Sequence, residues 1–77
     1  MNYNIEKIDE VVLALLYLTS FGEDNHKRTW KGQDWDVLSR LHKKGFIGDP
    51  KSKSKSVVFS SEGFLQSENL FKKYFEL

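Results

Sequence analysis

The sequence predicts a mostly helical α+β domain, and three observations support this fold class. Apolar residues recur at three- and four-residue spacing, the pattern of amphipathic helices, at residues 5–20, 35–44 and 61–75. Residues 56–60 read Ser-Val-Val-Phe-Ser, a short run typical of a strand. Gly45 and the Asp49-Pro50 pair interrupt the helical pattern before that run. The expected order is helix, short strand, helix, strand, turn, strand, helix.

The first expected helix runs from about residue 5 to residue 20, with Asn4 as its N-cap. Its inner face should consist of the residues that recur at helical spacing: Ile8, Val11, Val12, Leu15, Leu18 and Thr19. Leu13, Leu16 and Tyr17 widen the apolar surface beyond that face. A helix that is apolar nearly all round has to be covered nearly all round. Either the rest of the domain wraps it, or a second chain also packs against it.

The middle helix has start and stop signals in the sequence. Asp34 can cap it by accepting a hydrogen bond from a free backbone N–H in the first turn. Gly45 fits the left-handed position just after a helix end, and Phe46 is placed to fold back onto Leu41, as in a Schellman motif. The expected inner face carries four residues at helical spacing: Trp35, Leu38, Leu41 and His42.

Three short strands and a basic turn are expected around this helix. Residues 46–48 and 56–60 should form an antiparallel pair, because Asp49-Pro50 ends the first strand and three Lys-Ser pairs join it to the second. Residues 28–31 can add a brief third strand beside them.

A last helix is expected over residues 61–75, with Ser60 as its cap and Phe64, Phe71 and Phe75 along one face. A helix, a two-stranded finger and a following helix are the layout of a winged helix. In that layout the Lys-Ser turn is the tip of the wing. The sequence therefore predicts a compact winged-helix-like domain.

Length and composition limit the class of protein. Seventy-seven residues suffice for one domain with a small core, so we expect a single domain over residues 1–77. The absence of cysteine excludes disulfides and thiolate metal sites. The apolar run at residues 11–18 is short and follows acidic residues, which argues against a signal peptide and a membrane span. We expect a cytoplasmic protein with no membrane partner.

The net charge of +1 hides an uneven distribution of charge. Residues 27–56 contain nine Lys or Arg and three Asp, for a charge of +6, whereas residues 1–26 carry −4 and residues 57–77 carry −1. A local positive field attracts phosphates and acidic partners. The basic part also contains the middle helix and the turn, so a site for such a partner is expected there.

Signs of catalysis are scarce. His26 and His42 lie far apart, and no Ser-His-Asp set, glycine-rich phosphate loop or metal-ligand spacing is present. His42 is better explained by its favourable position at the negative end of the helix dipole, and His26 by a place in a loop. We expect no enzyme, no cofactor, no bound metal and no small-molecule ligand.

Six basic residues are candidates for contact with the phosphate backbone of nucleic acid: Lys31, Arg40, Lys43, Lys51, Lys53 and Lys55. The competing interpretation is a solvated turn in which Pro50 and the lysines protect a sheet edge from pairing. Asp34 and Asp36 lie where a recognition helix would face base edges, and their charge disfavours sequence-specific reading. Trp30 and Trp35 are expected in the core, with stacking on bases as the alternative.

Two resemblances accompany this reading. Residues 38–65, from Leu-Ser-Arg-Leu-His-Lys-Lys-Gly-Phe-Ile to Val-Val-Phe-Ser-Ser-Glu-Gly-Phe-Leu, resemble the recognition helix, wing and post-wing helix of MarR-like winged-helix regulators. Nearly the whole chain is more closely similar to a family of small bacterial proteins of unknown function, at residues 7–18, 30–32, 34–38 and 53–59. The first resemblance implies DNA binding, although the chain lacks the preceding helix and the long dimerisation helices of those regulators. The second implies no activity.

Two hypotheses about function follow. The first is weak nucleic-acid binding, with a role in transcription regulation, through the basic wing. The second is a protein-interaction or self-association module, such as a homodimer formed through apolar helix faces, with no nucleic-acid role. A small-ligand sensor or enzyme is a third class, and it would need an enclosed pocket with convergent polar groups.

Overall fold

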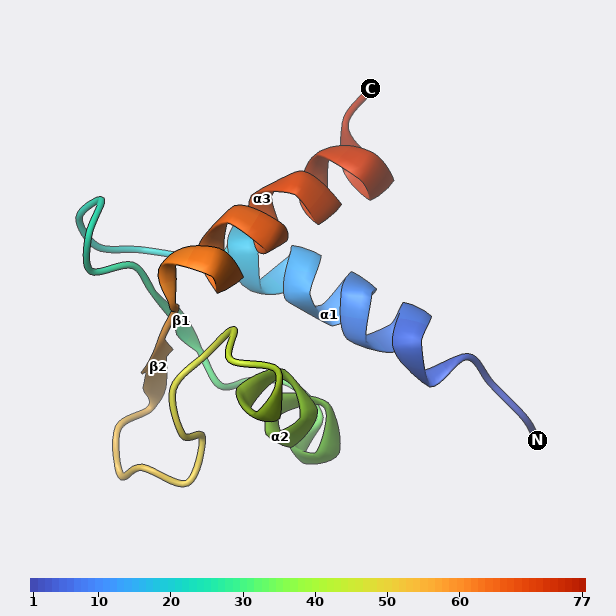
Figure 1. The fold of residues 1–77 in the computed structure, drawn as a ribbon, viewed down its shortest axis with the longest axis horizontal. Helices are drawn as coiled ribbons and strands as arrows, with labels where there is room; N and C mark the ends of the chain where they lie inside the picture. The colour runs from blue at the N-terminus through green and yellow to red at the C-terminus, as the bar shows by residue number, and fades with distance from the viewer.

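The computed structural model describes residues 1–77 and has the expected α+β class. Its elements are α1 (Ile5–Leu18), β1 (Arg28–Trp30), α2 (Trp35–Lys43), β2 (Ser56–Val58) and α3 (Ser61–Phe75). Helix α1 is central: it packs obliquely against α3 on one side and contacts α2 and β1 on the other (Figure 1). None of the three helices has the length and apolar character needed to cross a membrane.

All three expected helix caps are confirmed. The side chain of Asn4 accepts from the Lys7 N–H at 3.0 Å, and that of Asp34 accepts from the Val37 N–H at 3.2 Å. The Ser60 hydroxyl accepts from the Gly63 N–H at 2.9 Å. Each bond satisfies a backbone donor that has no partner within its helix. Helix α1 ends at Leu18, two residues earlier than expected.

The stop of α2 is the expected Schellman motif. Gly45 has a φ of +81°, in the left-handed region that favours glycine. Its N–H donates to the His42 carbonyl at 2.9 Å, and the Phe46 N–H donates to the Leu41 carbonyl at 3.1 Å. The chain therefore turns sharply and leaves α2 toward the sheet.

The sheet is smaller than expected and is paired differently. β1 and β2 are antiparallel, with Arg28 opposite Val58 and Trp30 opposite Ser56, so the expected third strand is the main partner of β2. The expected strand over residues 46–48 is only a bridge between Ile47 and Phe59. It stays this short because the chain turns away at Asp49 and Pro50, directly after the Gly48 N–H bonds the Val58 carbonyl.

The C-terminal end of α2 and the N-terminal end of α3 meet beside the bridge between Ile47 and Phe59. The Ser60 N–H donates to the Phe46 carbonyl at 3.0 Å, and the Ser60 hydroxyl donates to the Gly45 carbonyl. Gly63 lies so close that an added Cβ would be 1.9 Å from the Phe46 oxygen. Only glycine fits there without moving backbone, so α3 starts directly on the end of α2.

The inner face predicted for α1 is wrong in part: Ile8 and Val12 pack against the core, but the face is centred elsewhere. The buried residues of α1 are Asp9, Leu13, Ala14 and Leu16, whereas Leu18 of the predicted face is 64% exposed. Periodicity could not orient a helix that is apolar nearly all round. The core joins α1 to α2 and the strands through eight residues: Leu13, Leu16, Val37, Leu38, Leu41, Ile47, Val57 and Phe59.

Both tryptophans lie outside this core, contrary to the prediction. Trp30 is 53% exposed and Trp35 is 49% exposed. On α2 the buried residues are Val37, Leu38 and Leu41. Because Val37 completes the inner face of α2, Trp35 lies at its flank and partly in solvent.

Candidate nucleic-acid interface

The Lys-Ser turn (residues 49–55) projects from the end of the sheet as a separate loop (Figure 1). Its fold is local: the Asp49 carboxylate accepts from the Lys51 N–H at 2.9 Å, and the Asp49 carbonyl accepts from the Ser52 N–H at 3.2 Å. At the other end, the Ser54 hydroxyl accepts from the Ser56 N–H at 3.3 Å. Lys51, Lys53 and Lys55 are all exposed. The turn therefore presents three cations on an ordered loop.

Lys31 supports this turn from the adjoining segment. Its ammonium donates to the Pro50 carbonyl at 2.8 Å, the Ser52 carbonyl at 2.7 Å and the Ser52 hydroxyl at 3.1 Å. An ammonium has three donors, so these contacts occupy all of them. Lys31, one of the six candidates for phosphate contact, is thus engaged within the chain.

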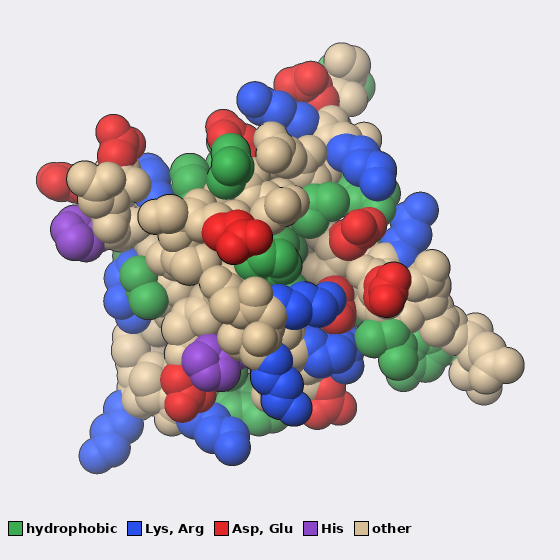
Figure 2. Space-filling model, viewed as in Figure 1, with side chains coloured by type: hydrophobic (Ala, Val, Ile, Leu, Met, Phe, Trp, Pro, Cys, Tyr) green, Lys and Arg blue, Asp and Glu red, His purple; other side chains and the backbone are tan.

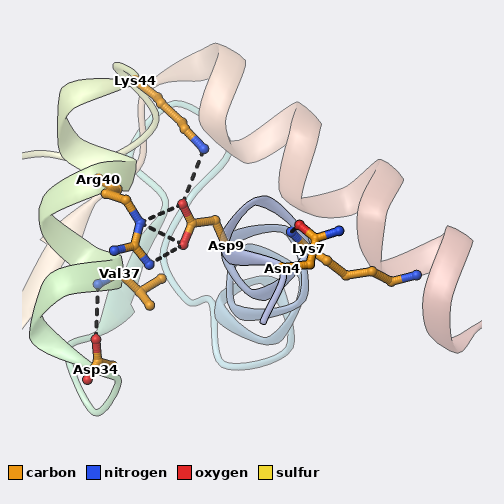
Figure 3. A network of polar contacts seen from close by, with 7 residues as sticks. All are labelled: Asn4, Lys7, Asp9, Asp34, Val37, Arg40 and Lys44. Atoms are coloured by element: carbon orange, nitrogen blue, oxygen red, sulfur yellow. Dashed lines mark hydrogen bonds and ion pairs between the residues drawn. The ribbon is translucent and has the colours of Figure 1, made fainter. Parts of the chain in front are cut away.

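Arg40 is also engaged within the chain, by a carboxylate on α1. Its Nε and Nη2 atoms approach the Asp9 oxygens at 2.8 and 2.7 Å, and the Lys44 Nζ atom lies 3.3 Å from the same carboxylate (Figure 3). Asp9 is only 2% exposed. A buried carboxylate needs such partners, since an unpaired charge in the interior is strongly unfavourable. We call Asp9, Arg40 and Lys44 the α1–α2 ion cluster.

The pKa values in this cluster follow from its geometry. Hydrogen bonds from Arg40 lower the pKa of Asp9 below its ordinary value of 3.8, against the raising effect of burial, and the Lys44 contact adds to the lowering. The Asp9 carboxylate in turn raises the pKa of the Arg40 guanidinium. Asp9 and Arg40 are therefore both charged at neutral pH.

Four of the six candidates remain open to a partner. Lys43, Lys51, Lys53 and Lys55 are exposed, and the chain's two ion pairs involve other residues. Basic side chains gather over the region of α2 and the Lys-Ser turn, with acidic side chains among them (Figure 2). Asp36 in the first turn of α2 is also exposed, and the Asp34 carboxylate accepts the capping hydrogen bond of α2. The positive surface is therefore a loop tip rather than a broad face.

Asp9 is the polar residue that sequence reasoning missed. Asp9 is one of the acidic residues that precede the apolar run at residues 11–18, and it directly follows the apolar Ile8. Arg40 and Lys44 are four residues apart, which places them on the same side of a helix. An acid within an apolar helix and two cations at that spacing were together a signal for an ion cluster.

Comparison with known proteins agrees with the second resemblance. Residues 4–77 match the model of DUF6429, a domain of unknown function. The chain belongs to the DUF6429 family. A 75-residue alignment with the uncharacterized protein y4hR of Sinorhizobium fredii (strain NBRC 101917 / NGR234) is 48% identical and covers 97% of each chain. No solved structure matches the chain. The expected membership of a small bacterial family of unknown function is thereby confirmed.

Proposed function

We propose that this DUF6429 protein is a compact winged-helix protein that binds nucleic-acid backbones weakly through the Lys-Ser turn, in a regulatory rather than a catalytic role. The element order supports the winged-helix assignment: α2 is followed by a turned loop, by β2 and by α3. The turn then corresponds to the tip of a wing. The expected binding is independent of base sequence.

One observation supports the proposal most directly. The turn carries three exposed lysines on backbone that is held by Asp49, Ser54 and the Lys31 ammonium. A loop ordered before binding loses less conformational entropy when it meets a phosphate backbone. Each lysine that neutralises a phosphate also releases a condensed counterion.

The start of α2 indicates why the proposed binding would not read bases. Asp34 accepts the capping bond of α2, and Asp36 adds a second carboxylate to the first turn. Both charges suit the positive end of the helix dipole. They would repel phosphates if α2 entered a groove, so contact through the loop tip is favoured over contact through the helix.

Salt dependence tests this proposal. With four free lysines, the plot of log affinity against log salt for duplex DNA should have a slope of about −3 to −4. Changing Lys51, Lys53 and Lys55 to Ala should reduce the slope to about −1, because one of the four contacts remains. The matched control changes three exposed lysines elsewhere, Lys7, Lys72 and Lys73, to Ala. Absence of binding at low salt, or equal losses in both variants, would overturn the proposal.

A second candidate function is self-association through the outer side of α1. Val11, Leu15 and Leu18 follow one another at helical spacing on that side, and Leu18 is 64% exposed. These residues belong to the face that the sequence assigned to the core. Exposed apolar surface on a helix favours a protein partner when it forms a continuous patch.

Sedimentation equilibrium tests the second candidate function. Self-association through α1 predicts a dimer at tens of micromolar protein and a monomer after Leu18→Glu. Leu65→Glu is the matched control, since Leu65 is 55% exposed on α3. A wild-type protein that stays monomeric over this range contradicts the second candidate.

A further inference from the structure

The outer face of the sheet carries side chains that the core does not use. Thr29 and Val57 are 0% and 2% exposed, so they point inward. Because side chains alternate along a strand, Arg28, Trp30 and Val58 point outward. Val58 is opposite Arg28 and diagonal to Trp30, so the three lie close together.

Phe21 joins the same face from the segment before β1. It forms an antiparallel bridge with Arg28, in which each N–H donates to the other residue's carbonyl at 2.9 Å. Residues paired in this way share a face of the sheet. The Phe21 and Trp30 rings are stacked, with centroids 4.6 Å apart and planes at 28°. We call Phe21, Arg28, Trp30 and Val58 the outer sheet face.

The exposure of this aromatic pair is not explained by packing. Trp30 remains 53% exposed although one side of its indole meets Phe21, and Phe21 is 36% exposed. Neither ring belongs to the core cluster or to the apolar residues packed against it. The Phe21 ring supports the indole while about half of the Trp30 side chain stays exposed, so a flat ligand would meet a surface that is already formed.

Positive charge borders the aromatic pair. Arg28 lies on the face itself, where its Nε donates to the Ser56 hydroxyl at 2.9 Å and its Nη2 to the Ser56 carbonyl at 3.0 Å. The Lys31 N–H bonds the Lys55 carbonyl at 3.1 Å, which places the end of the Lys-Ser turn beside the strand of Trp30. A groove of about 220 Å³ lies next to Arg28 and Val58 and is also lined by Asp49 and Ser52 of the turn.

We infer that the outer sheet face is a stacking platform for an unpaired base of single-stranded nucleic acid, whose backbone continues along the Lys-Ser turn. This inference rests on the proposed function and names its substrate class. Aromatic side chains beside a basic track are the general means of binding single strands, because every base has a face that can stack. A duplex keeps its bases stacked on one another, so the platform favours single strands.

The test measures affinity for a fluorescent oligothymidylate of about 12 nucleotides. The same backbone with abasic sites and a duplex of equal length serve as probes without an available base. We expect the oligothymidylate to bind roughly tenfold more tightly than the abasic strand. Trp30→Ala should remove that difference and leave the salt dependence unchanged, while Trp30→Phe should keep most of it.

Trp35 provides the matched control, because it is 49% exposed but lies at the start of α2. Trp35→Ala should leave the affinity unchanged. Trp35→Phe leaves Trp30 as the single indole, and its emission should be quenched by oligothymidylate but not by the abasic strand. This second measurement needs no substitution at residue 30, so it holds even if Trp30→Ala is poorly folded.

Several outcomes overturn the inference. Equal affinity for the oligothymidylate and the abasic strand rejects the platform, as do equal losses in Trp30→Ala and Trp35→Ala. If Trp30→Ala changes only sedimentation, a second copy covers this face and the platform is rejected. If binding depends on the turn lysines but not on Trp30, the platform fails while the proposed function stands. If no nucleic acid binds at low salt, both fail.

Discussion

The α1–α2 ion cluster and the Lys-Ser turn draw their cations from the same basic third of the chain, yet they use them in opposite ways. Arg40 and Lys44 meet a carboxylate that is 2% exposed, so one of their two charges is compensated within the protein. Lys51, Lys53 and Lys55 stand in solvent on a loop whose backbone is held by other groups. The difference shows that a net charge counted along a sequence does not measure the charge available to a partner. That depends on which oxygens the fold brings within reach.

The largest expected change in the free energy of unfolding comes from removing a cation of the α1–α2 ion cluster. Arg40→Ala leaves the buried Asp9 carboxylate with Lys44 alone, so the free energy of unfolding should fall further than in any of the variants that follow. Urea denaturation measures this change. Lys43→Ala, at an exposed neighbouring position, should stay within about 0.5 kcal/mol of wild type. A similar loss in both variants would show that the cluster is not the cause.

Removing the Asp9 carboxylate should lower the free energy of unfolding by a smaller amount. Asp9→Asn leaves two cations whose side chains are 34% and 43% exposed and can be hydrated, so we expect a loss of about 1 to 2 kcal/mol near neutral pH. The pKa of Asp9 is lowered in the folded protein, so its contribution is present above 3.8 and is lost as the pH falls through the lowered pKa. Urea titrations across this range should show the difference between wild type and Asp9→Asn closing in acid. A difference that stays constant at all pH values contradicts the pairing.

A smaller change in the free energy of unfolding is expected when Lys31 no longer supports the Lys-Ser turn. Lys31→Met keeps most of the aliphatic side chain but removes the bonds to Pro50 and Ser52, so the free energy of unfolding should fall by about 1 kcal/mol. Hydrogen exchange should become faster at the amides of residues 51–55 and not in the helices. If exchange in the turn does not change, the turn is held by its own contacts alone.

The smallest change in the free energy of unfolding is expected at the tip of the Lys-Ser turn. Changing Lys51, Lys53 and Lys55 together to Ala should alter the free energy of unfolding by no more than about 0.5 kcal/mol, because all three are exposed and unpaired. Thermal unfolding followed by circular dichroism measures it. A large loss would mean that the turn lysines stabilise the fold, and their role would then resemble that of Arg40.

Local signals in the sequence were sufficient for the starts of all three helices and for the end of α2. Asn4, Asp34 and Ser60 cap their helices as predicted, and Gly45 ends α2 in the expected motif, because each of these contacts involves residues only a few positions apart. α3 has the predicted bounds of residues 61–75 for the same reason.

The orientation of elements was not predictable in the same way. Nothing local to α1 shows that its inner face is centred on Leu13 and Leu16, because apolar residues lie on every side of it. The partners of Arg40 and Lys31 lie 31 and 19 or more positions away in sequence, so charge and spacing alone left both among the phosphate candidates. The exposure of Trp30 depends on strand pairing, which decides the face to which it points.

The bond between Ser60 and Gly45 joins the two positions at which the chain leaves α2 and enters α3. The intervening segment is therefore closed at its base, and both helices are positioned without help from residues 51–55. Natural or engineered insertions at that tip should be accommodated without moving the helices. The length and composition of the loop can diverge among relatives while the framework beneath it stays the same.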